Sequence, residues 1–168
     1  MYNDNDPPRE NRAAGTLRFV VDGSFDSALN RIRRTLADDH LCVAAEIDVK
    51  QRIKQSLDMK VPRCRVLLVD NPGFMLEIGA VNRASGIFVP LHLVVSAIGD
   101  RTLVYLLNLD HVHDGDLPMG VKRPLIELHH QVGRSIGKIA DVVCNAPEQP
   151  DGDGQCSRVA LIDLNSNA

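Results

Sequence analysis

The sequence predicts an α+β fold in which helices pack on a mixed β-sheet. Strand-like and helix-like segments alternate through the first half of the chain, a β-hairpin pattern follows near the middle, and a long amphipathic helix comes after it. At 168 residues, with 44% hydrophobic and 24% charged residues, the chain has the size and composition of one globular domain. We therefore expect a βαβ unit followed by a β-hairpin and a C-terminal helix.

The first strand and the first helix are predicted near the start of the chain. Residues 16–21 form an apolar, β-branched run that is typical of a strand. Ser24 is then a suitable N-cap for a helix, because its hydroxyl can accept a hydrogen bond from a free backbone N–H group. The apolar residues of this helix fall on one face, which consists of Phe25, Ala28, Leu29, Ile32 and Leu36. Such a helix is expected to lie on a sheet with its other face in solvent.

A second strand and a short helix follow. Residues 41–47 are apolar enough to predict an internal strand, and Asp48 is a suitable N-cap for an amphipathic helix that ends near Leu57.

The third strand–helix pair is marked by a proline at the start of its helix. Residues 63–69 predict the strand. Pro72 suits the first turn of a helix, since that turn needs no N–H donor from it, and the helix should end near Arg83. Asp70 or Asn71 can accept hydrogen bonds from the free N–H groups at its start.

Residues 87–98 and 102–109 predict a hairpin around Gly99 and Asp100, two residues that tolerate the positive φ of a tight turn. Pro90 lacks an N–H group, so we expect the first of these strands to lie at a sheet edge or to be bulged at that point.

The last predicted helix begins at Pro124 and carries one apolar stripe. The residues of the stripe are Leu125, Leu128, Val132, Ile136, Ile139 and Val143. Residues 146–154 are rich in Pro, Asp and Gly and predict a linker, and the apolar run 158–164 could add a strand to a sheet edge, of this chain or of a partner. The expected organisation is a flexible N-terminal arm over 1–15, a single domain over 16–145, and a linker and C-terminal tail over 146–168.

Composition argues against several classes of partner. The formal charge is −3 and Trp is absent, so we expect no nucleic-acid partner, and the basic cluster Arg31, Arg33 and Arg34 is interpreted as a solvated helix face. No apolar run approaches the roughly 18 residues of a membrane span, so we expect no membrane partner. The polar N-terminus does not resemble a signal peptide and the four cysteines form no CxxC pair, which favours a cytoplasmic protein.

With these elements placed, residues 16–110 resemble the family of bacterial domains of unknown function numbered 302, also called the TT1751-like fold. The resemblance is carried by Ser24-Phe25-Asp26, Glu46-Ile47-Asp48-Val49, Arg65-Val66-Leu67-Leu68, Asn71-Pro72 and Gly86-Ile87-Phe88-Val89-Pro90. It implies a compact α/β fold that forms homodimers, and no particular reaction. Many members carry cysteines where this chain has Asp70 and Leu91, so thiol chemistry is not expected to carry over.

The segment 110–116 gathers residue types that bind metals. In an extended segment His111 and His113 point to the same side, and with the carboxylate of Asp114 they suit a divalent metal such as zinc or iron. A two-residue turn in the hairpin would place His92 about 13 Å along the strand from His111, too far to share one ion. A third ligand from the last helix, His129 or His130, is the remaining candidate. The alternative interpretation is an ordinary acidic loop, with His129 a part-buried histidine of the helix.

A small-molecule site is the second hypothesis. We expect a ligand between the sheet and the helices, close to Asn71 and His92, with Arg65 and Asn108 as further polar candidates. The alternative for Asn71 is ordinary capping of the helix that follows. Nucleophile-elbow, Walker, HExxH and GxGxxG patterns are absent, so the sequence assigns no reaction. The function it favours is that of a homodimeric small-molecule-binding protein; the alternatives are a metal-dependent enzyme using the His/Asp cluster and a structural subunit of a larger assembly.

Overall fold

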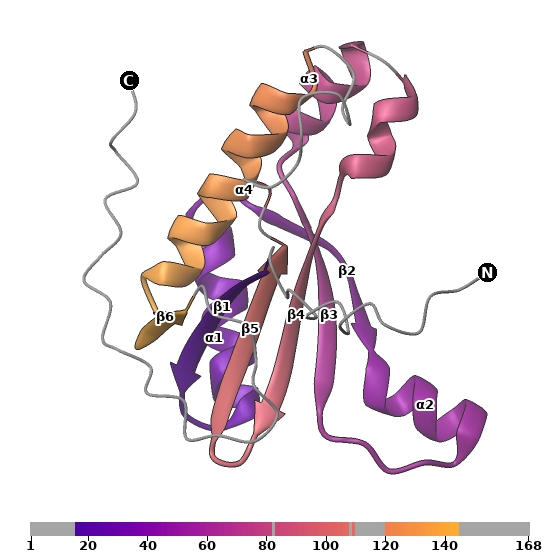
Figure 1. Cartoon of the computed structure of the whole chain (residues 1–168), viewed down its shortest axis with the longest axis vertical. Coiled ribbons are helices and arrows are strands. Elements are labelled where there is room, and N and C mark those ends of the chain that lie inside the picture. The colour runs from indigo at the N-terminus through magenta and orange to yellow at the C-terminus, as the bar shows by residue number, and fades with distance from the viewer. Residues whose placement is uncertain (1–15, 82, 108, 110–119, 145–168) are drawn as a thin grey trace, which may run out of the picture.

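The computed structural model of the chain describes residues 16–81, 83–107, 109 and 120–144, and Figure 1 shows how their helices and strands are arranged. The predicted arm, the segment 110–116 and the predicted tail lie outside these residues.

The described strands form one six-stranded sheet in the order β2-β3-β4-β5-β1-β6, and each strand is antiparallel to its neighbours. The strands are β1 (Thr16–Asp22), β2 (Cys42–Asp48), β3 (Cys64–Asp70), β4 (Leu91–Ile98), β5 (Arg101–Leu107) and β6 (Val142–Cys144). The helices are α1 (Phe25–Asp38), α2 (Val49–Leu57), α3 (Pro72–Val81), the 3₁₀ helix η1 (Arg83–Phe88) and α4 (Lys122–Gly137).

The core lies between one face of the sheet and the helices α1 and α4. The apolar stripe predicted for α1 is buried in it, as are Leu125, Leu128, Val132 and Ile136 of the stripe predicted for the last helix. Ile32, Leu128 and Ile136 are fully inaccessible to solvent. Alternate residues of the central strands, such as Leu93 and Val104, meet these helices from the sheet. Two helices on one face of a sheet therefore enclose a single core.

The predicted fold class is confirmed. The strands β1 and β2 run in the same direction and are joined by α1, as expected of a βαβ unit, but β5, β4 and β3 lie between them. The sequence predicted a mixed sheet, but every pair of neighbouring strands in the described sheet is antiparallel. The strand β2 was expected to be internal and instead lies at an edge of the sheet.

The hairpin and two of the helix caps agree with the sequence. The strands β4 and β5 pair around Gly99 and Asp100, with Ile98 opposite Arg101, and Gly99 has a φ of 58°. The Ser24 hydroxyl accepts a hydrogen bond from the backbone of α1, and the Asp48 carboxylate accepts one from the backbone N–H of Gln51 in α2 at 2.8 Å. Local turn and cap chemistry decides these positions.

Two element boundaries were predicted wrongly. The first strand of the hairpin, β4, begins at Leu91, just after Pro90, and the residues 83–88 form η1 instead of a strand. Because β4 has a neighbour on both sides, a proline within it would remove a hydrogen bond between strands, and Pro90 lies just before the strand. The last helix ends at Gly137, and the backbone N–H of Asp141 already donates to the carbonyl of Val20 in β1. Pairing with β1 thus replaces the helix that was predicted to continue to Val143.

Candidate functional site

An open groove of about 520 Å³ lies between α3 and α4. Its lining consists of Asn71, Gly73, Phe74, Glu77, Glu127, Gln131 and Arg134. Small-molecule sites in proteins have volumes of roughly 300–1,000 Å³, so the groove is large enough for a ligand. Phe74 is the one large apolar side chain in this lining, which favours a ligand with more polar than apolar surface.

Two amide side chains of the lining tie it to the turn between α1 and β2. The Nε2 group of Gln131 donates to the carbonyl of Asp39 at 2.9 Å, and the Nδ2 group of Asn71 donates to the carbonyl of His40 at 3.4 Å. His40 is held in the left-handed region with a φ of 59°. Because these hydrogen bonds come from α4 and from the start of α3, the turn fixes both sides of the groove.

Asn71 also caps α3. Its Oδ1 atom accepts a hydrogen bond from the backbone N–H of Gly73 at 2.9 Å, as the sequence predicted for a residue at the start of this helix. Asp70, one residue earlier, is buried, and burial raises the pKa of its carboxyl group. The cap and the groove lining therefore share one residue.

The charges of the groove are carboxylates on both sides and one guanidinium. Glu127, Gln131 and Arg134 follow one another at helical spacing on α4, and a guanidinium nitrogen of Arg134 lies 3.4 Å from a carboxylate oxygen of Glu127. Glu77 faces them from α3. The lining thus carries two negative charges and one positive charge.

Lys138, one turn beyond Arg134, forms an ion pair with Asp39, the residue whose carbonyl accepts the hydrogen bond from Gln131. The hydrogen bond from Lys138 lowers the pKa of the Asp39 carboxyl group, and a hydrogen bond from Ser135 acts in the same direction. The ion pair links the end of α4 to the end of α1.

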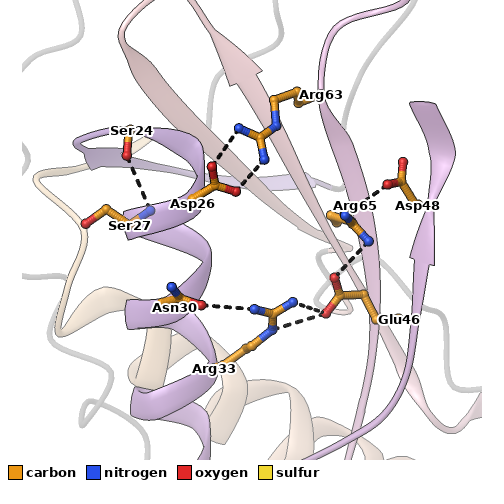
Figure 2. Close-up of polar contacts among 9 residues, drawn as sticks. All are labelled: Ser24, Asp26, Ser27, Asn30, Arg33, Glu46, Asp48, Arg63 and Arg65. Atoms are coloured by element: carbon orange, nitrogen blue, oxygen red, sulfur yellow. Dashed lines mark hydrogen bonds and ion pairs between the residues drawn. The ribbon is translucent and has the colours of Figure 1, made fainter. Parts of the chain in front are cut away.

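Arg65, a predicted ligand-binding residue, belongs to a network of ion pairs beside α1 (Figure 2). A guanidinium nitrogen of Arg65 lies 3.2 Å from a carboxylate oxygen of Glu46, and another lies 2.9 Å from one of Asp48. Glu46 is also bound by Arg33 of α1, at 2.6 Å. These contacts join β2, β3 and α1, so Arg65 holds structural elements together away from the groove.

A second part of the network is also structural. Arg63 binds both carboxylate oxygens of Asp26, and this contact lowers the pKa of the Asp26 carboxyl group (Figure 2). The Arg63 guanidinium also lies 4.6 Å from the centre of the Phe25 ring. Arg63 therefore fastens the first turn of α1 to the start of β3.

Of the four predicted ligand-binding residues, the structure places Asn71 in the groove. His92 lies in β4 opposite Leu68, and its side chain is exposed on the sheet face that points away from α1. Asn108 lies outside the described residues. The described part of the chain thus does not bring Asn71, Arg65 and His92 together.

The metal-site prediction falls largely outside the described residues, which include neither His111, His113 nor Asp114. Within the described ranges, no group of three or more His, Cys, Asp and Glu side chains could hold a metal ion. His130 is half-buried on α4, with its ring centre 5.8 Å from that of the buried His129. The metal site and the enzyme hypothesis built on it stay predictions.

Sequence reasoning missed most of the groove lining. The spacing of Glu127, Gln131 and Arg134 shows that they share one helix face, opposite the apolar stripe of α4. No local pattern indicates that this face meets Phe74 and Glu77 of α3, because that contact depends on how two distant helices dock.

The face of the sheet opposite α1 and α4, on which His92 lies, carries a central row of apolar side chains. Its central row contains Ile47, Val66, Val94 and Tyr105, which pair across β2, β3, β4 and β5 and are all half-buried. Antiparallel sheets with one wet face usually alternate apolar and polar residues. This face, called the open sheet face below, departs from that pattern.

Comparisons with known proteins give the family of this chain and a solved structure with a similar fold. Residues 17–141 match the model of the family described as domain of unknown function DUF302. The crystal structure of an uncharacterized conserved DUF302 protein from Bacillus stearothermophilus is similar, with a TM-score of 0.66, 14% sequence identity, and coverage of 74% of this chain and 97% of that chain. No curated protein matches the chain. Among the described residues, no helix has both the length and the apolar character to cross a membrane. The match over most of the chain shows that this protein belongs to the DUF302 family.

Proposed function

We propose that this protein binds a small molecule in the groove between α3 and α4. The observation that carries the proposal is the 520 Å³ groove itself, which is lined by polar side chains from two helices and by one aromatic ring. The hydrogen bonds of Asn71 and Gln131 to the turn between α1 and β2 hold two of the lining side chains in place, which favours a preformed site.

The lining favours a ligand that donates hydrogen bonds and carries positive charge. The amide NH₂ groups of Asn71 and Gln131 already donate to backbone carbonyls. The carboxylates of Glu77 and Glu127 are acceptors only, and Arg134 balances one of them. An ammonium group suits the remaining carboxylate, and an aromatic or aliphatic body suits the ring of Phe74. An organic amine is therefore the ligand class that we propose.

A titration followed by nuclear magnetic resonance tests this assignment. The isotope-labelled full chain is titrated with phenethylamine and, separately, with phenylpropionate, which has a similar body but the opposite charge. We expect amide signals of α3 and α4 to shift with the amine and not with the carboxylate. Glu77→Gln should weaken amine binding about fivefold, since one partly solvated charge contributes about 1 kcal/mol.

Asp100→Asn is the matched control, because it removes one negative charge at the hairpin turn, and it should leave the titration unchanged. The proposal would be wrong if neither probe shifted signals of the groove. Equal shifts by amine and carboxylate would contradict the ligand class and leave the groove in place.

We also propose that the protein acts as a homodimer through the open sheet face. Covering the apolar row of Ile47, Val66, Val94 and Tyr105 with the same row of a second copy would bury it from water, and two sheets packed face to face are a common arrangement. A two-fold axis makes such an interface complementary to itself.

Sedimentation velocity of the full chain tests the dimer. Val94→Lys places a charge in the centre of the open sheet face and should convert dimers into monomers. Leu76→Lys is the matched control: it adds the same charge at an apolar residue that is 75% exposed on α3, and it should leave the dimer intact. Monomers in the unchanged protein, or dimers that survive Val94→Lys, would rule this interface out.

A further inference from the structure

The helix α2 lies at the periphery of the molecule (Figure 1). It spans nine residues, Val49–Leu57, and none of them is buried. Figure 1 shows it at a corner, at the opposite end of the sheet from α3 and away from α1 and α4. A helix this short is only marginally stable by itself. Its exposed residues can therefore indicate what kind of surface it contacts.

The helix and the turn after it form a basic patch. Lys50, Arg52, Lys54 and Lys60 are all exposed, and Asp58 is the single acidic residue between 49 and 60. These twelve residues carry a net charge of +3 in a chain whose formal charge is −3. This element at the periphery therefore carries a local excess of positive charge.

Large apolar side chains lie among these cations. Leu57 is 65% exposed and Met59 is 56% exposed, at the end of the helix that points away from the sheet. Val49, Ile53 and Leu57 share one helix face by their spacing, and the cations flank that face on both sides. The first two are half-buried against the body of the protein, so the exposed apolar surface is confined to the tip.

We propose that α2 and its following turn, residues 49–60, bind the surface of an anionic phospholipid membrane. Cations at the sides of a helix attract anionic headgroups, and a Leu and a Met at its tip can enter the boundary between headgroups and acyl chains. Nucleic acid would match the positive charge, but its phosphate backbone would not bury the apolar side chains of Leu57 and Met59. An acidic protein groove would need a longer exposed apolar face than this tip provides.

This proposal departs from the sequence-based expectation of no membrane partner. That expectation rests on the lack of a segment long enough to span a bilayer. A helix that lies on the surface needs no span.

Co-sedimentation of the full chain with vesicles provides the first test. We expect binding to vesicles of phosphatidylcholine mixed with phosphatidylglycerol, little binding to pure phosphatidylcholine, and weakening at high salt. Lys50→Glu with Lys54→Glu reverses two charges on α2 and should reduce binding at least 25-fold, because each basic residue near the surface contributes about fivefold. Arg34→Glu with Arg123→Glu makes the same charge change on α1 and α4 and should have little effect. Equal loss with both pairs, or equal binding to both kinds of vesicle, would overturn the proposal.

The second test is a fluorescence measurement. Because the chain contains no Trp, the emission of a single introduced Trp reports the surroundings of that residue alone. The fluorescence of Leu57→Trp should shift to shorter wavelength when anionic vesicles are added, because the indole enters the lipid boundary. Leu76→Trp, at a similarly exposed position on α3, should not shift. Soluble polyglutamate that binds as tightly as the vesicles and causes no such shift would assign the patch to an acidic protein and overturn the membrane proposal.

Discussion

Two buried or half-buried aspartates respond to their surroundings in opposite ways. The pKa of Asp39 is lowered by its hydrogen bond to Lys138, whereas the pKa of Asp70 is raised by burial. A lowered pKa means that the ionised form stabilises the fold, and a raised pKa means that the ionised form costs stability. The two residues therefore predict opposite dependences of stability on pH.

For Asp39, the ion pair should stabilise the fold above the pKa of an unfolded aspartate, about 3.9, and the stabilisation should be lost as the pH falls through the lower value of the folded protein. Lys138→Met should lower the free energy of unfolding at neutral pH by up to about 1 kcal/mol, since the lysine is partly exposed. Chemical denaturation at neutral and at acidic pH measures this difference, which should vanish in acid. Arg123→Met, which removes an exposed cation elsewhere on α4, should show no such pH dependence.

For Asp70, the protonated form is favoured in the folded state, so its contribution is present below the unfolded pKa of about 3.9 and is lost as the pH rises through the raised folded value. Asp70→Asn removes the charge and should raise the free energy of unfolding at neutral pH by roughly 1 kcal/mol. No gain is expected in strong acid. A loss of stability at both pH values would mean that the ionised carboxylate supports the start of α3, and it would contradict the destabilising role assigned to this charge.

At the scale of single elements, α2 depends on its cap more than the other helices do, because it has no buried residue. The Asp48 carboxylate caps it and also binds Arg65. Asp48→Asn keeps a capping side chain, whereas Asp48→Ala removes it, so Ala alone should destabilise the helix by about 1 kcal/mol. Amide hydrogen exchange over residues 51–57 should then speed up about fivefold. Equal effects of the two substitutions would assign the stability of α2 to the ion pair.

Element boundaries were predictable where local chemistry sets them and unpredictable where pairing does. Ser24, Asp48 and Asn71 act as caps, and Gly99 forms its turn, because each depends on a few neighbouring atoms. The end of α4 was misjudged because the apolar stripe of a helix and an apolar strand look alike over a few residues. Pairing of β6 with β1, which is distant in sequence, decides the outcome.

For the whole molecule, the fold class could be predicted because the apolar patterns of α1, α4 and the hairpin agree with one another. The strand order could not, since inserting β5, β4 and β3 between β1 and β2 leaves no local trace. The groove could not be predicted for the same reason. Asn71 could be identified from the sequence because helix capping depends on neighbouring residues, whereas the α4 residues that line the groove with it could not.

The open sheet face leads to a prediction for the stability of the whole molecule. If the open sheet face is covered by a second copy, the unfolding temperature should rise with protein concentration, because association stabilises the folded state by mass action. Val94→Lys should remove this dependence, and Leu76→Lys should retain it. A midpoint that is independent of concentration in the unchanged protein would contradict the dimer.

The central claim is that a preformed groove between α3 and α4 binds a small amine. Native mass spectrometry of the gently purified full chain, with phenethylamine added, tests it most directly. We expect one bound amine per chain, retained in Asp100→Asn and lost in Glu77→Arg, which places a cation in the groove. Bare protein, or an amine that stays bound in Glu77→Arg, would contradict the claim.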